Sequence, residues 1–262
     1  MRALNINKPT MNIAELWEIF LQFEYDEKIL LKGIENFLKK YKRKKILDCA
    51  CGSGFLTLNL IKRGYDITCT DGSASMLKFL SVKAKKMGIR IKSQKILWSQ
   101  LAKKYSNDFD VLLCRGSSLI YVNAWDRSSQ GKKEAVLNAL QNFFDVLKPG
   151  GILYIDTTTE KALRSKKPLR AKFKPRKIHN HIIEIEEVIF TNRSKKLRTW
   201  KPTAIVDGQS HSFTRYSLYL PHNELKKMLK EVGFIDVKKR TIPGEHYAVF
   251  IARKPAASRG EK

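Results

Sequence analysis

The stretch of residues 44–71, KKILDCACGSGFLTLNLIKRGYDITCTD, limits the folds open to this chain more than any other. An apolar run that ends at Asp48 leads into a glycine-containing turn, a helical pattern follows over residues 55–61, and a second apolar run ends at Asp71. This order predicts one βαβ half-unit, in which the backbone approaches a ligand closely at the N-terminus of the helix. A carboxylate at the tip of the second strand can accept hydrogen bonds from two neighbouring hydroxyls, so Asp71 suits a ribose.

The spacing of the glycines distinguishes two classes of ligand. Dinucleotide sites use G-x-G-x-x-G, but here Gly52 and Gly54 are followed by Thr57 where the third glycine would stand. The segment from Asp48 to Gly54 instead reads D-x-x-C-G-x-G. This is the first motif of class I S-adenosylmethionine-dependent methyltransferases, which the chain resembles. The alternative is an ordinary strand–turn–helix whose glycines occur by chance.

Length and composition set the outer limits. With 262 residues, of which 43% are hydrophobic, the chain can form one large domain or one domain with an insertion. No run approaches the roughly 20 apolar residues of a membrane span, and the N-terminus lacks a signal-peptide layout, so we expect a cytoplasmic protein without a membrane partner. Cys49, Cys51, Cys69 and Cys114 fall in predicted strands or in the glycine turn, with no histidine near the close pair. We therefore expect neither a disulfide framework nor a metal site.

The charge is unusual, because 51 basic residues face 25 acidic ones and give a net charge of +26. Such a field attracts polyanions, so nucleic acid is one candidate partner. The basic residues are nevertheless spread over the whole chain, and lysines outnumber arginines 36 to 15, whereas dedicated phosphate recognition favours arginine. A lysine-rich background explains the charge equally well, and we rank nucleic acid below a small-molecule substrate.

Apolar spacing along the rest of the chain predicts alternating helices and strands. Two helices are expected between residues 13 and 38, where Trp17 and Tyr25 are candidates to close on a ligand. Further helices are expected over 72–86, 132–148 and 222–232, and strands over 89–93, 109–114, 152–160, 235–240 and 247–252. We expect four segments: N-terminal lid helices and the cofactor-binding half of the core (1–160), an inserted antiparallel substrate roof (161–214), the C-terminal part of the core (215–254) and a disordered tail (255–262).

Motifs over residues 15–253 carry a narrower resemblance. LDCACGSG, the pair Leu97-Trp98, CRGSSLIYV, LKPGGILYIDTT and YSLYLPHNELKKMLKEVGF follow one another, with the insertion before the last. Together they resemble the glycine/sarcosine N-methyltransferase-like branch of class I methyltransferases, to which the insertion followed by Y-x-x-Y-x-P-H points. The resemblance implies an α/β fold, namely a Rossmann-like seven-stranded mixed sheet with helices on both faces and an inserted antiparallel β subdomain. It also implies S-adenosyl-L-methionine as the cofactor.

The resemblance implies a cofactor site at one edge of this sheet. The glycine turn would cradle the amino-acid end of the cofactor, Asp71 would bind its ribose, and the pair Leu97-Trp98 would flank its adenine. The residues expected to bind the cofactor are Tyr25, Ala50, Cys51, Gly52, Gly54, Asp71, Gly72, Met76, Leu97, Trp98, Cys114 and Arg115.

The substrate is expected to lie beside the turn that follows the fourth strand, against Ser117, Ser118 and Thr158. The resemblance places Ser117 where the family has an asparagine, and Thr158 where the glycine enzyme has an arginine that grips the substrate carboxylate. An amine nucleophile must arrive without its proton, so a carboxylate or phenol is needed nearby as the proton acceptor. The candidates for this catalytic role are Asp156, Tyr121 and Tyr216, of which Tyr216 serves equally as a packing residue of the inserted sheet.

These features predict an enzyme that transfers a methyl group by in-line displacement to a small-molecule amine. The departures at Ser117 and Thr158 predict that free glycine is not its main substrate. One alternative is an RNA methyltransferase, although no Asn-Pro-Pro-Tyr-like tetrad follows the fourth strand. Another is a cofactor-binding protein without catalysis, against which the polar residues of the rim argue. The sequence leaves open whether the chain forms a homo-oligomer.

Overall fold

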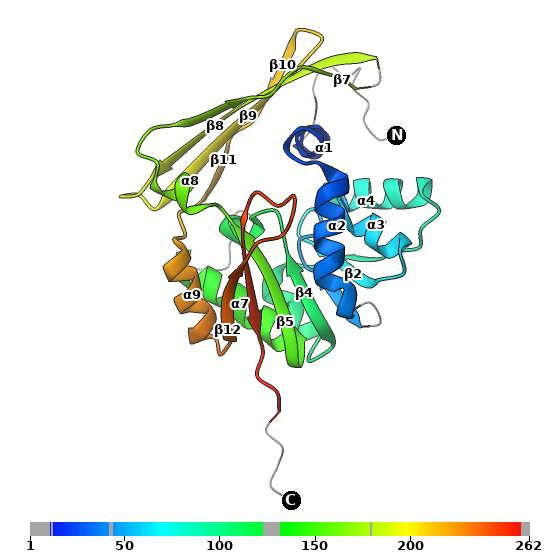
Figure 1. Cartoon of the computed structure of the whole chain (residues 1–262), viewed down its shortest axis with the longest axis vertical. Coiled ribbons are helices and arrows are strands. Elements are labelled where there is room, and N and C mark those ends of the chain that lie inside the picture. The colour runs from blue at the N-terminus through cyan, green and yellow to red at the C-terminus, as the bar shows by residue number, and fades with distance from the viewer. Residues whose placement is uncertain (1–10, 12, 42–43, 123–131, 179, 258–262) are drawn as a thin grey trace, which may run out of the picture.

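The computed structural model describes residues 11, 13–41, 44–122, 132–178 and 180–257. A sheet runs through the core of the molecule (Figure 1). It has seven strands in the order β12-β13-β5-β4-β1-β2-β3. Strands β1 to β5 pair in parallel, whereas β13 runs antiparallel to both β5 and β12. The predicted seven-stranded sheet of mixed direction is thereby confirmed. Its strands are β1 (Lys45–Asp48), β2 (Asp66–Asp71), β3 (Lys92–Lys95), β4 (Phe109–Cys114), β5 (Leu147–Thr157), β12 (Ile235–Arg240) and β13 (Ala248–Arg253).

Helices cover both faces of this sheet because its central strands are apolar on both sides. Ile46 of β1 packs with α2, α3 and α4 on one face, and its neighbour Leu47 packs with α5, α7 and α9 on the other. The helices are α1 (Ile13–Glu24), α2 (Glu27–Leu38), α3 (Thr57–Lys62), α4 (Ala74–Lys86), α5 (Leu101–Lys104), α7 (Lys132–Val146), α8 (Glu160–Arg164) and α9 (His222–Glu231), with short 3-10 turns at Lys39–Tyr41, Trp98–Gln100 and Ser118–Tyr121.

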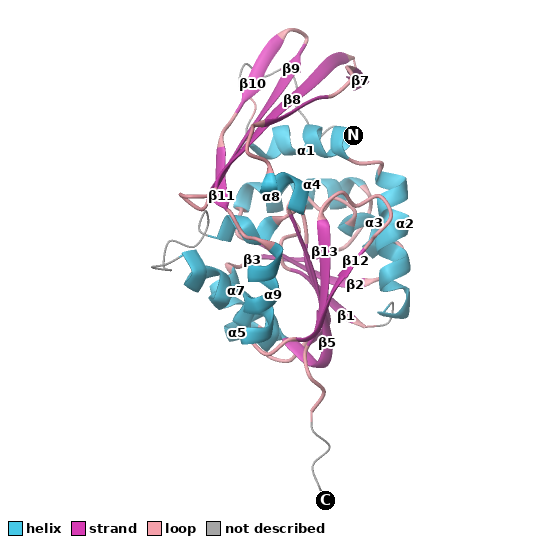
Figure 2. Ribbon diagram, turned by 60° about the vertical axis from the view of Figure 1, so that its left-hand side comes forward, coloured by secondary structure: helices cyan, strands magenta, loops and turns pink. Residues whose placement is uncertain are grey.

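A second, antiparallel sheet lies over the rim of the core, and α1 packs against its inner face (Figure 2). Successive side chains of a strand point to opposite faces. Trp200, Ala204 and Val206 therefore point inward with Ile183 and Ile185, onto Phe20 and its neighbours on α1. The strands of this sheet are β6 (Leu169–Lys172), β7 (Arg176–Ile178), β8 (His181–Asn192), β9 (Leu197–Val206), β10 (Gln209–Ser212) and β11 (Arg215–Leu218).

Some boundaries differ from the expected ones. Helix α7 ends at Val146 and β5 already begins at Leu147, so Pro149-Gly150-Gly151 lies in the first part of that strand. The second sheet runs on to Leu218, because β11 pairs with β9, and thus reaches into the segment expected to return to the core. Residues 1–10 and 258–262 of the expected lid and tail lie outside the described residues. In the described part of the chain, no helix has the length and apolar character needed to cross a bilayer.

Candidate active site

A cavity opens where the carboxyl ends of β1, β2 and β4 meet the connection between α1 and α2, and we name it the rim cavity. It encloses about 1260 Å³, including the open solvent at its mouth. This is the edge of an open parallel sheet at which ligands bind. Its lining residues include Trp17, Tyr25, Asp48, Ala50, Cys51, Gly52, Ser53, Asp71, Gly72, Met76, Leu97, Trp98, Arg115, Ser118, Tyr121, Asn138 and Arg215.

The glycine turn leaves space beside its backbone. Gly52 has a φ of +52° and a side chain there would meet no atom within 4 Å, so the turn forms an open cradle. The turn is held by Asp48, whose buried carboxylate accepts a hydrogen bond from the Thr57 hydroxyl at 2.6 Å. Burial raises the pKa of Asp48, and the nearby Arg115 guanidinium opposes that rise.

Asp71 is oriented by two backbone donors at the end of β2. Its carboxylate oxygens accept hydrogen bonds from the N–H groups of Gly52 at 2.9 Å and Ser73 at 2.8 Å. Burial raises the pKa of Asp71, while these two N–H groups favour its ionised form. Each oxygen keeps a further lone pair, so the fixed carboxylate can still accept two hydroxyl donors from a ribose.

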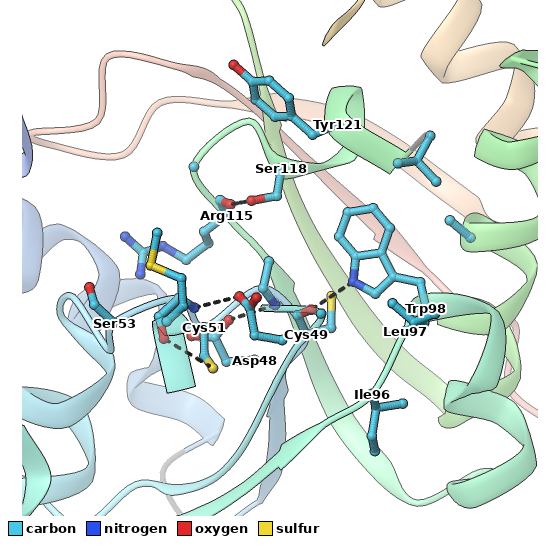
Figure 3. Close-up of a pocket in the computed structure, with 18 of the residues that line it drawn as sticks. Asp48, Cys49, Cys51, Ser53, Ile96, Leu97, Trp98, Arg115, Ser118 and Tyr121 are labelled. Atoms are coloured by element: carbon cyan, nitrogen blue, oxygen red, sulfur yellow. Dashed lines mark hydrogen bonds between the residues drawn. The ribbon is translucent and has the colours of Figure 1, made fainter. Parts of the chain in front are cut away.

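Trp98 forms an aromatic wall opposite the glycine turn. Its indole N–H donates to the carbonyl oxygen of Cys49 at 2.7 Å (Figure 3). Its ring packs edge-on against Phe143 with centroids 5.3 Å apart. Ile96 and Leu97 continue this apolar wall. A flat and partly desolvated base fits such a surface.

The residues of the rim cavity fit the amino-acid end of S-adenosylmethionine as well. The Arg115 Nε and the Ser53 Oγ are buried and have no hydrogen-bond partner among the described residues. Both residues line the cavity beside the open cradle at Gly52. A buried polar atom without a partner costs roughly 1–3 kcal/mol, and a carboxylate would satisfy a guanidinium and a hydroxyl together.

Tyr25 closes one side of the rim cavity. Its ring stacks on His246 with centroids 4.4 Å apart, and its hydroxyl donates to Glu245 at 3.4 Å. Burial raises the pKa of the Tyr25 phenol. The connection between β12 and β13 thereby holds this tyrosine at the cavity.

Two residues expected at the cofactor lie elsewhere. Cys114 is fully buried in the core and lines no described cavity. Gly54 is also absent from the cavity wall: a Cβ there would lie 2.4 Å from a methyl carbon of Leu80 and 3.0 Å from Leu58. This glycine allows the turn to pack against α4 and α3, and the expected contact with the ligand is replaced by this close packing.

We expect Gly54→Ala to destabilise the fold more than Gly208→Ala. Both glycines have left-handed φ angles, +83° and +86°, so both variants carry the same backbone cost of about 1–2 kcal/mol. A side chain at Gly208 meets nothing within 4 Å, whereas the one at Gly54 overpacks the core at Leu80 and adds about 1–3 kcal/mol. Urea unfolding of the two variants measures the difference, and equal midpoints would contradict this packing role.

A second hollow lies between the rim of the core and the inner face of the second sheet, and we name it the side chamber. It encloses about 650 Å³ including its solvent, and it shares Trp17, Gly116 and Tyr121 with the rim cavity. Its lining residues are Trp17, Glu24, Gly116, Ser117, Tyr121, Thr158, Thr159, Ala162, Glu187, Ile189, Arg198, Trp200, His246 and Tyr247.

The residues expected at the substrate divide between the two hollows. Ser117 and Thr158 line the side chamber, whereas Ser118 lines the rim cavity and donates from its hydroxyl to the Arg115 carbonyl at 2.6 Å. Ser117 has a φ of +53°, a left-handed conformation that is uncommon for a residue other than glycine. Such strain is typical of functional sites.

The Asp156 side chain stabilises the turn at Gly116 and Ser117, and it lies outside both hollows. It is fully buried, and its oxygens accept hydrogen bonds from the backbone N–H groups of Gly116 and Ser117. Burial and the neighbouring Glu245 raise the pKa of Asp156 to about 8. The expectation that Asp156 faces the substrate is not met, because both of its oxygens hold the turn that presents Ser117.

The two tyrosine candidates also separate. Tyr121 lines both hollows and accepts a hydrogen bond from Arg198 at 3.4 Å. Tyr216 is 61% exposed and lines neither, because its neighbour Arg215 takes the inward position on β11. The Arg215 guanidinium lies over the Tyr121 ring, 4.0 Å from its centroid. The structure therefore brings Tyr121 to the site and leaves Tyr216 on the outer face of the second sheet.

The side chamber contains charged residues that sequence reasoning missed, namely Glu24, Glu187 and Arg198. Burial and the carboxylates of Glu187 and Glu245 raise the pKa of Glu24 to about 8, and Arg198 opposes this rise. Alternation along β9 could have identified Arg198, since it shares the inward side with Trp200 and Ala204. Glu24 carried no comparable signal, because it stands at the end of a helix.

We expect replacement of Glu24 by Gln to remove part of the pH dependence of stability. The folded-state pKa of Glu24 is about 8 and its ordinary value is 4.5, so the folded protein keeps a proton that the unfolded chain has released. Stability from this group is therefore full below about pH 4.5 and is lost as the pH rises through about 8. The wild type should lose on the order of 5 kcal/mol at most relative to Glu24→Gln over this range. Urea unfolding at several pH values measures it, and parallel curves would contradict it.

Comparison with known proteins agrees with this geometry. Residues 46–151 match the family model for a methyltransferase domain. A glycine/sarcosine N-methyltransferase of Halorhodospira halochloris is 31% identical over 120 residues, 45% of this chain and 41% of that protein. The matches span about half or less of the length of the curated relatives.

Solved structures share the fold over almost the whole chain. The sugar N-methyltransferase KedS8 of a Streptoalloteichus species is 13% identical with a TM-score of 0.70, over 94% of this chain and 95% of that one. CalS10 of Micromonospora echinaspora, an amino pentose methyltransferase solved with S-adenosylmethionine bound, is 12% identical with a TM-score of 0.70, over 91% of this chain and 96% of that one.

The matched residues 46–151 form a methyltransferase domain, and the sheet order and the rim cavity agree with a class I S-adenosylmethionine-dependent methyltransferase. Within that class it is similar to the glycine/sarcosine N-methyltransferases over 45% of its length.

Proposed function

We propose that this chain methylates the nitrogen of a small-molecule amine that binds in the side chamber. The observation that carries the proposal is the adjacency of the two hollows, which share Trp17, Gly116 and Tyr121. A cofactor in the rim cavity and an acceptor in the side chamber would meet at these residues. Bound S-adenosylmethionine supplies a methyl group on a positively charged sulfur, so the bond that breaks is already activated.

The remaining task of the protein is to align the acceptor and to exclude water. The inner face of the second sheet and α1 cover the side chamber, with Trp17 and Trp200 in edge-on contact at a centroid distance of 5.4 Å. The turn that Asp156 stabilises brings Ser117 to the side chamber from the side of the core. These rigid parts support positioning of a small acceptor.

The charges of the side chamber favour an amine over a nucleic acid. The chain as a whole carries a net charge of +26, yet the chamber is lined by two glutamates, Glu24 and Glu187, and by one arginine, Arg198. Carboxylates repel phosphate groups and attract ammonium groups. The excess of lysine over the rest of the chain therefore gives no reason to place RNA in this chamber.

Incubation of the purified protein with methyl-labelled S-adenosylmethionine, an amine panel and total RNA tests the proposal. Mass spectrometry identifies the methylated product, and a nuclease-treated sample separates RNA products from small ones. We expect a nuclease-resistant N-methylated amine. Transfer to RNA alone, or to none of the amines, would reject it.

A further inference from the structure

The side chamber combines charges of opposite sign that do not pair with each other. Glu24 comes from the end of α1, Glu187 from β8 and Arg198 from β9. Among the described residues, the Glu24 carboxylate has no hydrogen-bond or ion-pair partner, although Arg198 influences it electrostatically. One oxygen of Glu187 accepts a hydrogen bond from the Trp200 indole at 2.8 Å, which fixes this carboxylate in the wall. The chamber thus offers the fixed carboxylate of Glu187 beside the Glu24 side chain, which holds its proton up to about pH 8.

A cation bound beside these two side chains would stabilise the ionised form of Glu24. Burial raises the pKa of Glu24 most, and the neighbouring negative charges of Glu187 and Glu245 raise it further because they oppose its ionisation. Trp17 and Tyr121 add aromatic surfaces to the same wall. Aromatic faces attract ammonium groups, by about 0.5–2 kcal/mol. Both features point to a positively charged ligand.

Three further polar atoms of the chamber wall lack partners. The Oγ of Ser117, the Oγ1 of Thr158 and the Nε of Arg198 are buried and make no hydrogen bond with the described residues. Their residues are only 2%, 3% and 6% exposed. Buried donors and acceptors normally find partners, so three unpaired polar atoms around one chamber indicate a ligand with several oxygen atoms.

We propose that the side chamber binds a hydroxylated amine as its ammonium ion, whose positive nitrogen lies between the carboxylates of Glu24 and Glu187 and releases its proton to one of them before it accepts the methyl group. The hydroxyl oxygens of this compound meet Ser117, Thr158 and Arg198. This inference rests on the proposed function, since it names the chemical class of the methyl acceptor. It separates that class from simple alkylamines, which lack the oxygens, and from sugars or polyols, which lack the charge.

Two probes that differ only in the amino group test the nitrogen site. They are 1-amino-1-deoxysorbitol and sorbitol, titrated into the full chain and followed by saturation-transfer NMR, which detects weak binding without any methyl transfer. We expect the amine to bind at least about tenfold more tightly than sorbitol. Glu24→Gln and Glu187→Gln should each lower the affinity for the amine about tenfold and leave that for sorbitol unchanged.

The chain supplies matched controls for both substitutions. Glu18→Gln changes another glutamate of α1 that pairs with Lys83, and Glu186→Gln changes the neighbour of Glu187 that pairs with Lys172 on the outer face. Both should leave the two affinities unaltered.

Thr158→Val tests the oxygen site and should lower the affinity for both probes severalfold. Equal binding of the two probes, no binding of the amine, or full affinity in both glutamate variants would overturn the inference. These outcomes are independent of catalysis. If the wild type methylates an amine but fails the probe test, the inference falls and the proposed function stands. If the probes behave as expected while no amine is methylated, the proposed function falls and the inference stands.

Discussion

Asp71→Asn is expected to lower the affinity for S-adenosylmethionine roughly 30- to 150-fold, which corresponds to about 2–3 kcal/mol. The carboxylate is held by two backbone N–H groups and lines the rim cavity with free lone pairs, so it is preorganised for a pair of hydroxyl donors. An amide in its place turns one acceptor into a donor, which opposes both the ribose hydroxyl and the backbone N–H of Gly52 or Ser73.

Calorimetric titration with S-adenosylmethionine measures this loss. Asp66→Asn is the matched control, because Asp66 begins the same strand and makes only an exposed ion pair with Lys92. Urea unfolding of both variants shows whether the cradle still folds. An affinity of Asp71→Asn equal to that of the control would refute the assignment of the ribose site.

The parallel half of the fold could be predicted because its signals are local. Strands β1, β2 and β4 are short, largely apolar runs, and each is followed by a turn with glycine or a helix cap, such as Ser73, whose hydroxyl accepts from the N–H of Met76. Strand β3 lacks this signal, because its sequence KSQK is polar and exposed, and it lies at Lys92–Lys95 where residues 89–93 were expected. The boundary between α7 and β5 was harder to predict. Pro149 and the glycines after it are typical stop signals for a helix, but here they lie within the strand, at the irregularity between the pairs Phe109–Leu147 and Val111–Ile152.

The cofactor half of the site could be predicted for the same reason. Ten of the twelve residues expected at the cofactor line the rim cavity, and their positions follow from strand ends. The exceptions are Cys114, whose side chain is buried in the core, and Gly54, which packs closely against Leu80 and Leu58. A motif indicates which residues occur together, but only packing shows which of them touch the ligand.

The acceptor half could not be predicted residue by residue. Its charged lining comes from a helix end and two strands far apart in the sequence, Glu24, Glu187 and Arg198. On β11 the choice between Arg215 and Tyr216 depended on strand register, since one step along a strand reverses the face. The register of β11 is set by its pairing with β9, which no local pattern in residues 215–218 reveals.

Free glycine is expected to be a poor acceptor, with a kcat/KM roughly a hundredfold below that of the best amine in a broad panel. Thr158 contributes a single hydroxyl to the side chamber, and a hydroxyl cannot grip a carboxylate with the two charge-assisted bonds that an arginine provides. The chamber encloses about 650 Å³, and its orphan polar atoms come from three separate elements, so one glycine molecule would leave several of them unsatisfied. An amine with more oxygen atoms satisfies more of them at once.

A competition assay with glycine, sarcosine, dimethylglycine and hydroxylated amines decides the point, with formation of each N-methyl product followed by mass spectrometry. Saturable turnover of glycine that exceeds every other amine would show that the guanidinium of Arg198 alone suffices to bind its carboxylate, and the preference for a larger acceptor would then be wrong.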